Sequence, residues 1–232
     1  MDTALGQVWQ LLNPALAVLV YYLVFGLLLG VTRGVEYFIP FLAIGVLSYQ
    51  FTQRSVTQAA SSLSGNSGLM RSIRFPRAML PLTTVVTETL AYLPGVAVFV
   101  AVVLVAGVPV SLTWILLPLL IVLQFVFNVG AALVVARLSY DVRDVKNVLP
   151  FVFRLLFYGS GVIFNVNAYL DDDRLKWLFT ANPLFSLLAL YRWSLLGMEA
   201  DPWELTSVVI WAVVLVVGGL WWFRRGEARY GH

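Results

Sequence analysis

Residues 112–136 read LTWILLPLLIVLQFVFNVGAALVVA, a run that contains no charged side chain. A helix needs about 20 mainly apolar residues to cross roughly 30 Å of hydrocarbon, because it rises about 1.5 Å per residue. The run is longer than this minimum. It therefore predicts a membrane-spanning helix.

The composition of the whole chain gives the same indication. Of the 232 residues, 60% are hydrophobic and 12% are charged, and the mean hydropathy is +0.87. Soluble domains carry roughly 45–50% apolar and about 25% charged residues. So much apolar surface does not fit inside one soluble core of this size, and it needs lipid as its solvent.

Further apolar segments predict an all-α membrane protein with six transmembrane helices in a single domain, residues 1–232. The predicted spans are Pro14–Gly30, Tyr37–Thr52 with a polar extension through Leu63, Ala78–Ala106, Leu112–Ala136, Leu149–Phe164 and Leu205–Phe223. The stretch Leu184–Leu196 is too short to span and is interrupted by Tyr191-Arg192-Trp193. We expect short re-entrant or interfacial helices here, before the last span.

The positions of lysine and arginine predict the orientation. Eleven of the 15 lie on one set of loops and near the C-terminus, and the remaining four lie on the other set. Loops rich in lysine and arginine stay in the cytoplasm. We therefore expect a multi-pass protein of the cytoplasmic (inner) membrane with both termini inside. The loops Ser61–Arg77 and Ser139–Val148 would be cytoplasmic, and Asn165–Glu204 would be the largest external segment.

The residues that usually carry chemistry are scarce. The chain has no cysteine, and its one histidine is His232, which excludes disulfides, thiol nucleophiles and Cys/His metal sites. A P-loop needs a Gly-Lys pair before Ser or Thr, but Lys146 and Lys176 follow Val145 and Leu175. We expect no catalytic residue, metal or cofactor in this chain and no nucleic-acid partner. Any ATP that drives transport would be hydrolysed by a separate subunit.

The first cytoplasmic loop predicts a short amphipathic helix at the membrane surface. Small and polar residues break the preceding helix, and Leu69, Met70 and Ile73 then repeat at helical spacing beside Arg71 and Arg74. This helix is either a docking contact for a cytoplasmic partner or a basic anchor on the lipid headgroups.

The second cytoplasmic loop mixes charges of both signs. Asp141 and Asp144 would suit a Mg²⁺-diphosphate site, since hard cations favour paired carboxylates. Arg143 and Lys146 beside them would neutralise such a site. The alternatives are a second docking contact and a solvated loop with local ion pairs. The run Asp171-Asp172-Asp173 has no second acidic cluster and indicates a solvated loop tip.

Two charged residues lie inside predicted spans, where burial in hydrocarbon is costly. Glu88 and Arg154 would lie at similar depths, which permits an ion pair between the third and fifth spans or separate contacts with a polar path. Aromatic residues on the first and fifth spans include Tyr21, Phe25 and Tyr158. Such rings either stack on sugars in a pore or pack against lipid.

Several segments together, in this order, resemble the ABC-2 family of permeases. They are Leu5-Gly6-Gln7-Val8-Trp9 with Asn13-Pro14, Phe75-Pro76-Arg77 with Leu80-Pro81, Asp141-Val142-Arg143-Asp144-Val145, Asn182-Pro183-Leu184, Tyr191-Arg192-Trp193 and Leu196-Gly197. Within the family, the chain is similar to polysaccharide exporters of the O-antigen and teichoic-acid type.

The resemblance implies a homodimer that works with two ABC ATPase subunits, which would hold the Mg-ATP. The cargo would be a lipid-linked polysaccharide, and the arginine-rich composition adds a galactan to the expected cargoes. Ser67–Phe75 would be the coupling helix, with Ser67, Leu69, Met70, Arg71, Ile73, Arg74, Phe75, Asp141, Arg143 and Asp144 as coupling residues. The implied channel residues are Tyr21, Phe25, Glu88, Arg154, Tyr158 and Phe164, and the implied external gate residues are Asn182, Pro183, Tyr191, Arg192 and Trp193.

Three other functions compete with polysaccharide export. An ABC-2 efflux permease for drugs or lipids would bind its cargo in a compact cavity. An intramembrane prenyl-diphosphate enzyme using Asp141 and Asp144 would need a second acidic cluster facing them. A secondary transporter would show repeated halves with broken helices, and the sequence contains no such duplication.

Overall fold

The computed structural model describes residues 4–72, 75–170 and 172–226, and every regular element within them is a helix, which confirms the all-α prediction. The long elements are α1 (Ala4–Tyr21), α2 (Phe38–Gly65), α4 (Met79–Val105), α5 (Leu117–Asp141) and α10 (Pro202–Gly226). The short ones are η1 (Tyr22–Leu28), α3 (Ser67–Ser72), η2 (Leu112–Leu116), α6 (Val145–Gly159), α7 (Val166–Tyr169), α8 (Asp173–Thr180) and α9 (Pro183–Leu196).

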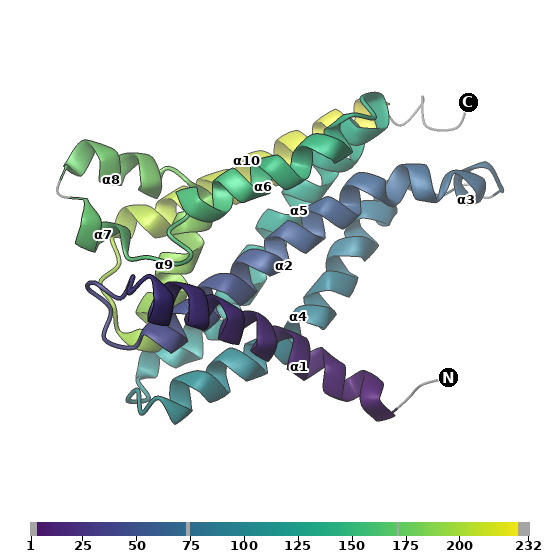
Figure 1. Cartoon of the computed structure of the whole chain (residues 1–232). Helices are drawn as coiled ribbons and strands as arrows, with labels where there is room; N and C mark the ends of the chain where they lie inside the picture. The colour runs from purple at the N-terminus through teal and green to yellow at the C-terminus, as the bar shows by residue number, and fades with distance from the viewer. Residues whose placement is uncertain (1–3, 73–74, 171, 227–232) are drawn as a thin grey trace.

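The helices run between two ends of an elongated bundle (Figure 1). One end carries α3 and the α5–α6 loop, and the described ends of the chain, Ala4 and Gly226, lie toward it; we call it the α3 end. The other end carries α7, α8 and the connection from η1 to α2, and we call it the loop end. The described part of the chain thus begins and ends toward the same end of the bundle, which agrees with an even number of crossings.

Helix α2 lies at the centre of the bundle and packs against α1, α4, α5, α6 and α9. It is buried on nearly every side over residues 40–52, and from Arg54 to Ser61 it exposes one face. Helix α10 packs instead on α5 and α9. The main core cluster draws side chains from α1, α2, α4, α5, α6, α9 and α10, namely Val18, Phe41, Phe99, Phe127, Phe153, Leu187 and Ala212.

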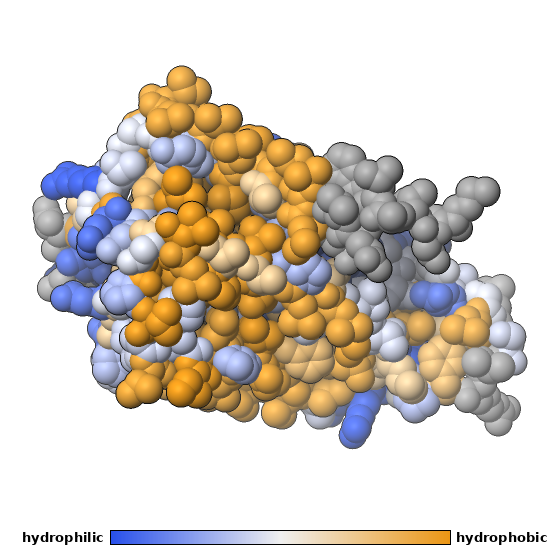
Figure 2. All heavy atoms as spheres, turned by 90° about the horizontal axis from the view of Figure 1, so that it is seen from below, coloured by the Kyte–Doolittle hydropathy of each residue, from blue (hydrophilic) through white to orange (hydrophobic). Residues whose placement is uncertain are grey.

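The face of the bundle seen in Figure 2 is mostly apolar along its middle, and polar residues gather toward its ends. Four segments are long and apolar enough to cross a membrane, and they are Leu11–Leu28, Met79–Val105, Leu112–Asp141 and Pro202–Gly226. Exposed apolar side chains cover these segments, including Leu90, Ile115, Leu119 and Val217. Soluble monomers rarely expose such a continuous apolar belt. The chain is a membrane protein.

The predicted limits of the fifth span are wrong. Helix α6 covers Val145–Gly159 rather than Leu149–Phe164, and its 15 residues reach only about 22 Å. It ends where Ser160 leaves the helical conformation and Gly161 takes a φ of 58°. A positive φ suits glycine, which has no Cβ to clash. The count of six spans therefore stays a prediction, with α2 and α6 as the two helices that the hydropathy of the sequence supports least.

Helix α1 changes to a π-helix over η1. The amide of Leu29 donates to the carbonyl oxygen of Val24 at 3.0 Å, five residues earlier. The sequence pattern did not predict this wider turn. Gly26 lies inside it, and a Cβ there would lie 2.8 Å from the ring of Tyr22.

Candidate functional site

The described part of the predicted coupling helix is α3, which covers Ser67–Ser72, and Phe75 lies outside any helix. The two apolar residues of α3 point in different directions: Met70 is 8% exposed and Leu69 is 44% exposed. Met70 packs with Leu63 and Phe223, and Phe75 covers the same cluster. Ile73, Arg74 and the side chain of Arg71 lie outside the described residues. Helix α3 therefore packs on the bundle through Met70 and exposes the adjacent Leu69 to its surroundings.

The α5–α6 loop lies beside the end of α2. Nζ of Lys146 donates to the hydroxyl of Ser64 at 2.6 Å, which ties the start of α6 to the residues that lead into α3. Asp141, Arg143 and Asp144 are exposed next to this tie. The structure thus brings the two predicted coupling segments to the same end of the bundle.

The geometry of this loop gives a diphosphate site little support. Oδ2 of Asp141 lies 3.4 Å from Nε of Arg137, one helical turn before it. Its charge is therefore partly compensated within the chain. Among the described residues there is no group of three acidic or histidine side chains that would hold a metal ion.

Aromatic rings from three helices form a continuous row. Tyr21 stacks on Phe25 at 6.1 Å and contacts Phe157 at 5.5 Å, and Phe157 contacts Tyr158 at 5.5 Å and Tyr49 at 5.3 Å. Three predicted channel residues, Tyr21, Phe25 and Tyr158, therefore belong to one row. Phe157 and Tyr49 complete it. The rings of Tyr21 and Phe25 are half-buried, and Tyr158 is 52% exposed.

Phe164 lies apart from this row. Because α6 ends at Gly159, Phe164 is in the loop that follows, where its ring contacts Tyr169 at 6.0 Å. The guanidinium of Arg33 lies over the Tyr169 ring, 5.8 Å from its centroid. Phe164 is thus a loop-end residue rather than part of the fifth span.

Among the described residues, no salt bridge joins Glu88 to Arg154, so of the two alternatives for these charges, the ion pair between the third and fifth spans does not form. Helix α4 packs on α1, α2 and α5, whereas α6 packs on α2 and α5. Glu88 instead lines a small pocket with Gln50 and Arg54, and Arg154 is exposed. Glu88 and Arg154 therefore lie in separate environments on different helices.

A buried network of polar side chains joins four helices in the core. The Tyr191 hydroxyl donates to Oε1 of Gln124 at 2.9 Å, and Nε2 of Gln124 donates to the carbonyl oxygen of Ser48 at 2.8 Å and to Oγ1 of Thr52 at 2.9 Å. The hydroxyls of Ser48 and Tyr92 lie 2.8 Å apart. Sequence reasoning missed four of these five residues. The available signal was a lone amide or hydroxyl inside an otherwise apolar run.

Arg192 is almost fully buried and holds the broken end of α6. Its Nη1 donates to the carbonyl oxygen of Gly161 at 2.9 Å, and its Nη2 donates to that of Val162 at 2.8 Å. The guanidinium lies over the Phe41 ring, 3.4 Å from the centroid. Backbone carbonyls left free at a helix end within a membrane need such donors.

Asn182 holds the same region from the start of α9. Its Oδ1 accepts from the amide of Leu184 at 3.0 Å, which caps the helix, and Pro183 follows as a favoured first helical residue. Its Nδ2 donates to the carbonyl oxygen of Gly159 and to the Ser160 hydroxyl, each at 3.0 Å. The predicted gate residues Asn182, Tyr191 and Arg192 therefore act inside the subunit, where they fix α9 against α6 and α5.

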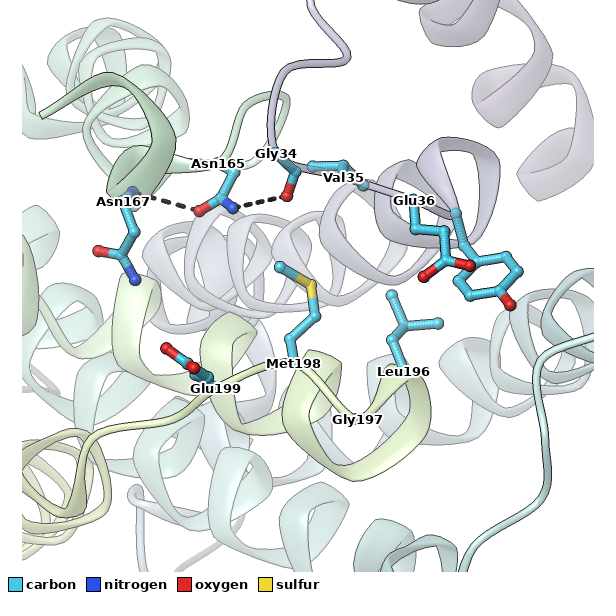
Figure 3. Close-up of a pocket in the computed structure, with 10 residues that line it drawn as sticks. Gly34, Val35, Glu36, Asn165, Asn167, Leu196, Gly197, Met198 and Glu199 are labelled. Carbon is cyan, nitrogen blue, oxygen red and sulfur yellow. Dashed lines mark hydrogen bonds between the residues drawn. The ribbon is translucent and has the colours of Figure 1, made fainter.

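The loop end contains a pocket of about 370 Å³ (Figure 3). Three connections that are distant in the sequence form its walls, namely residues 34–37, 165–167 and 196–199. Sequence reasoning did not identify this pocket, because nothing in the sequence shows that these three segments meet, although Leu196-Gly197 belongs to the family resemblance.

Comparison with known proteins places the chain in a family. Residues 2–196 match the family described as ABC-2 type transporter. The chain is 26% identical to an O-antigen export system permease protein RfbA of Klebsiella pneumoniae, with 99% of this chain and 87% of the relative aligned. It is 25% identical to RfbA of Myxococcus xanthus over 81% of this chain and 72% of the relative. It is 22% identical to the polysialic acid transport protein KpsM of Escherichia coli over 96% and 86%. The family match covers far more than half of the sequence, and the chain belongs to the ABC-2 type transporter family.

Proposed function

We propose that this chain is the membrane subunit of an ABC transporter that exports a lipid-linked polysaccharide across the cytoplasmic membrane. The observation that carries the proposal is the similarity, over most of the chain, to permeases whose names specify O-antigen export and polysialic acid transport. ABC ATPase subunits would supply the energy. Mg-ATP would bind in those subunits and not in this chain.

The row of aromatic rings supports a glycan as the cargo. A hydrated sugar polymer must cross about 30 Å of hydrocarbon, so groups on the path must replace its water. Ring faces contact the apolar faces of sugars, and tyrosine hydroxyls form hydrogen bonds as well. Tyr21, Phe157 and Tyr158 offer both features in adjacent positions. A compact drug site would not require an extended row.

The exposed face of α6 supports a second copy of this chain across the path. Phe151, Leu155 and Tyr158 are 65%, 74% and 52% exposed on one short helix. Homodimerisation would cover part of this face and enclose the aromatic row between two subunits. Two ATPase subunits would then bind below.

The α3 end would be the cytoplasmic end in this arrangement, with both termini inside. Leu69 and the exposed α5–α6 loop would contact the ATPase, and Met70 would transmit the movement to the core cluster around Leu63 and Phe223. ATP-driven closure of the ATPases would thereby move the helix bundles relative to each other.

Deletion of the gene, followed by immunoblotting of the surface polysaccharide, tests this function. We expect the surface polymer to disappear and to return with the wild-type chain. A drug-efflux permease would instead leave the polymer intact and lower the resistance to hydrophobic drugs. That result would replace the proposal with the efflux alternative.

A further inference from the structure

We propose that the pocket at the loop end binds one sugar unit of the emerging glycan. The identification of the sugar with the cargo rests on the function proposed above, whereas the binding chemistry rests on the pocket itself. The pocket of about 370 Å³ falls within the range of roughly 300–1,000 Å³ in which small-molecule sites occur.

The pocket is preformed, because side chains hold its walls together. Nδ2 of Asn165 donates to the carbonyl oxygen of Gly34 at 3.0 Å, and Oδ1 of Asn165 accepts from the amide of Asn167 at 3.2 Å (Figure 3). Gly34 has a φ of 69°, and a Cβ there would lie 2.5 Å from Cβ of Ala168. The two connections therefore fit against each other only with glycine at this position.

Two polar side chains in the walls are available to a ligand. The side-chain amide of Asn167 and the carboxylate of Glu199 have no hydrogen-bonding or ionic partner among the described residues. A carboxylate only accepts hydrogen bonds, and an amide both donates and accepts. A ligand that satisfies both must carry several donors and at least one acceptor. Neighbouring hydroxyl groups on a sugar ring meet this requirement.

Apolar atoms lie between these polar groups. Val35, Leu196 and Met198 line the same space, and Met198 extends its side chain across the middle of it (Figure 3). A sugar ring has an apolar face that would cover them, whereas a hydrated cation does not. Glu36 and Tyr37 line the same pocket.

A smaller cavity of about 30 Å³ adjoins the pocket and shares Asn165, Asn167, Met198 and Glu199 with it. Arg192 and Glu204 line this cavity and are 5% and 4% exposed. Nε of Arg192 and Oε2 of Glu204 are buried without a hydrogen-bond partner in the described chain. Unpaired buried atoms of charged groups are costly. The cavity has room for a water molecule or a ligand hydroxyl, which would satisfy them.

The test is saturation-transfer-difference NMR on the full chain in nanodiscs with methyl glycosides of galactose, mannose, rhamnose and N-acetylglucosamine. We expect saturable binding of at least one. Asn167→Ala should weaken it about fivefold and Glu199→Gln about tenfold, since neutral and charged hydrogen bonds contribute about 1 and 1.5 kcal/mol. Asn147→Ala, which removes an exposed amide at the α3 end, is the matched control and should have no effect. Binding of none of the four glycosides, or binding that both pocket variants leave unchanged, overturns the inference.

Spermidine is tested in the same way and Mg²⁺ by isothermal titration calorimetry, because the carboxylates at the pocket could also attract a cation. Binding of either cation that depends on Glu199, without binding of any glycoside, also overturns the inference. The assay uses neither ATPase nor transport. Loss of export on gene deletion without glycoside binding therefore refutes only the pocket, whereas intact export on deletion refutes the proposed function.

Discussion

Gly45 and Arg192 fit together so closely that a Cβ on Gly45 would lie 2.5 Å from Nη2 of Arg192. The same Cβ would lie 2.6 Å from the carbonyl oxygen of Val162, which Arg192 binds. Helix α2, helix α9 and the broken end of α6 meet at this point. The contact allows an irregular backbone to lie inside the bundle with its carbonyl groups bonded.

Replacement of Gly45 by alanine should therefore destabilise the subunit. The added methyl group meets a backbone oxygen as well as a side chain, and overpacking of this kind costs about 1–3 kcal/mol. We expect a lower unfolding midpoint in detergent, measured by scanning fluorimetry. Gly218→Ala on α10 is the control, because a Cβ at Gly218 has no neighbour within 4 Å. Equal midpoints for the two variants would show that the fit is not tight.

Arg192→Lys should also destabilise the chain, although it keeps the positive charge. One ammonium group does not reproduce the planar guanidinium that donates to Gly161 and Val162 from two nitrogens and stacks on Phe41. We expect a loss of about 2 kcal/mol in the free energy of unfolding by urea titration. Arg54→Lys, at an exposed position of α2, should change it little. A fully stable Arg192→Lys protein would contradict the role assigned to the guanidinium.

Substitutions at Leu69 and Met70 should have different effects, the first on coupling to the ATPase and the second on the stability of the subunit. Leu69→Ala removes an exposed side chain, so we expect the thermal midpoint to stay and the substrate-stimulated ATPase rate of the reconstituted complex to fall. Met70→Ala empties a buried site and should cost about 2–5 kcal/mol of stability. If Leu69→Ala left the ATPase stimulation unchanged, α3 would not be the docking element.

The aromatic row should matter for export and not for folding. Tyr158→Leu keeps an apolar side chain at a half-exposed position but removes the ring and its hydroxyl. We expect several-fold less surface polysaccharide, since an aromatic contact is worth about 0.5–1.5 kcal/mol. Trp221→Leu on α10 removes an equally exposed ring outside the row and should leave export normal. The same loss in both variants would exclude a special role for the row.

The sequence predicts the long helices well, because runs such as Met79–Val105 exceed the span length and have clear limits. It fails at α6 for a tertiary reason. A helix continuing to Phe164 would satisfy its own carbonyl groups, and the observed break requires donors from residues some 20–30 positions later, Asn182 and Arg192. Hydropathy within a window contains no information about such partners.

The site residues were hard to predict for the same reason, because their partners come from other helices. The similar predicted depths of Glu88 and Arg154 in the membrane allowed an ion pair. Depth in the membrane does not say which helices are neighbours, and α4 and α6 are not. The family resemblance implies an external gate role for Tyr191 and Arg192, which stays a prediction, and the sequence did not show that both side chains are buried. A lone polar residue such as Gln124 can be recognised in the sequence as a member of a buried hydrogen-bond network, because a polar side chain in an apolar run needs a partner.

ATP-dependent translocation by the reconstituted chain is the most direct test of the central claim. Proteoliposomes containing the chain and its ABC ATPase should move a radiolabelled lipid-linked glycan across the bilayer only when both proteins and Mg-ATP are present. Liposomes with the chain alone should move none. Translocation by the chain without the ATPase, or chemical turnover of the glycan lipid by the chain alone, would contradict the account.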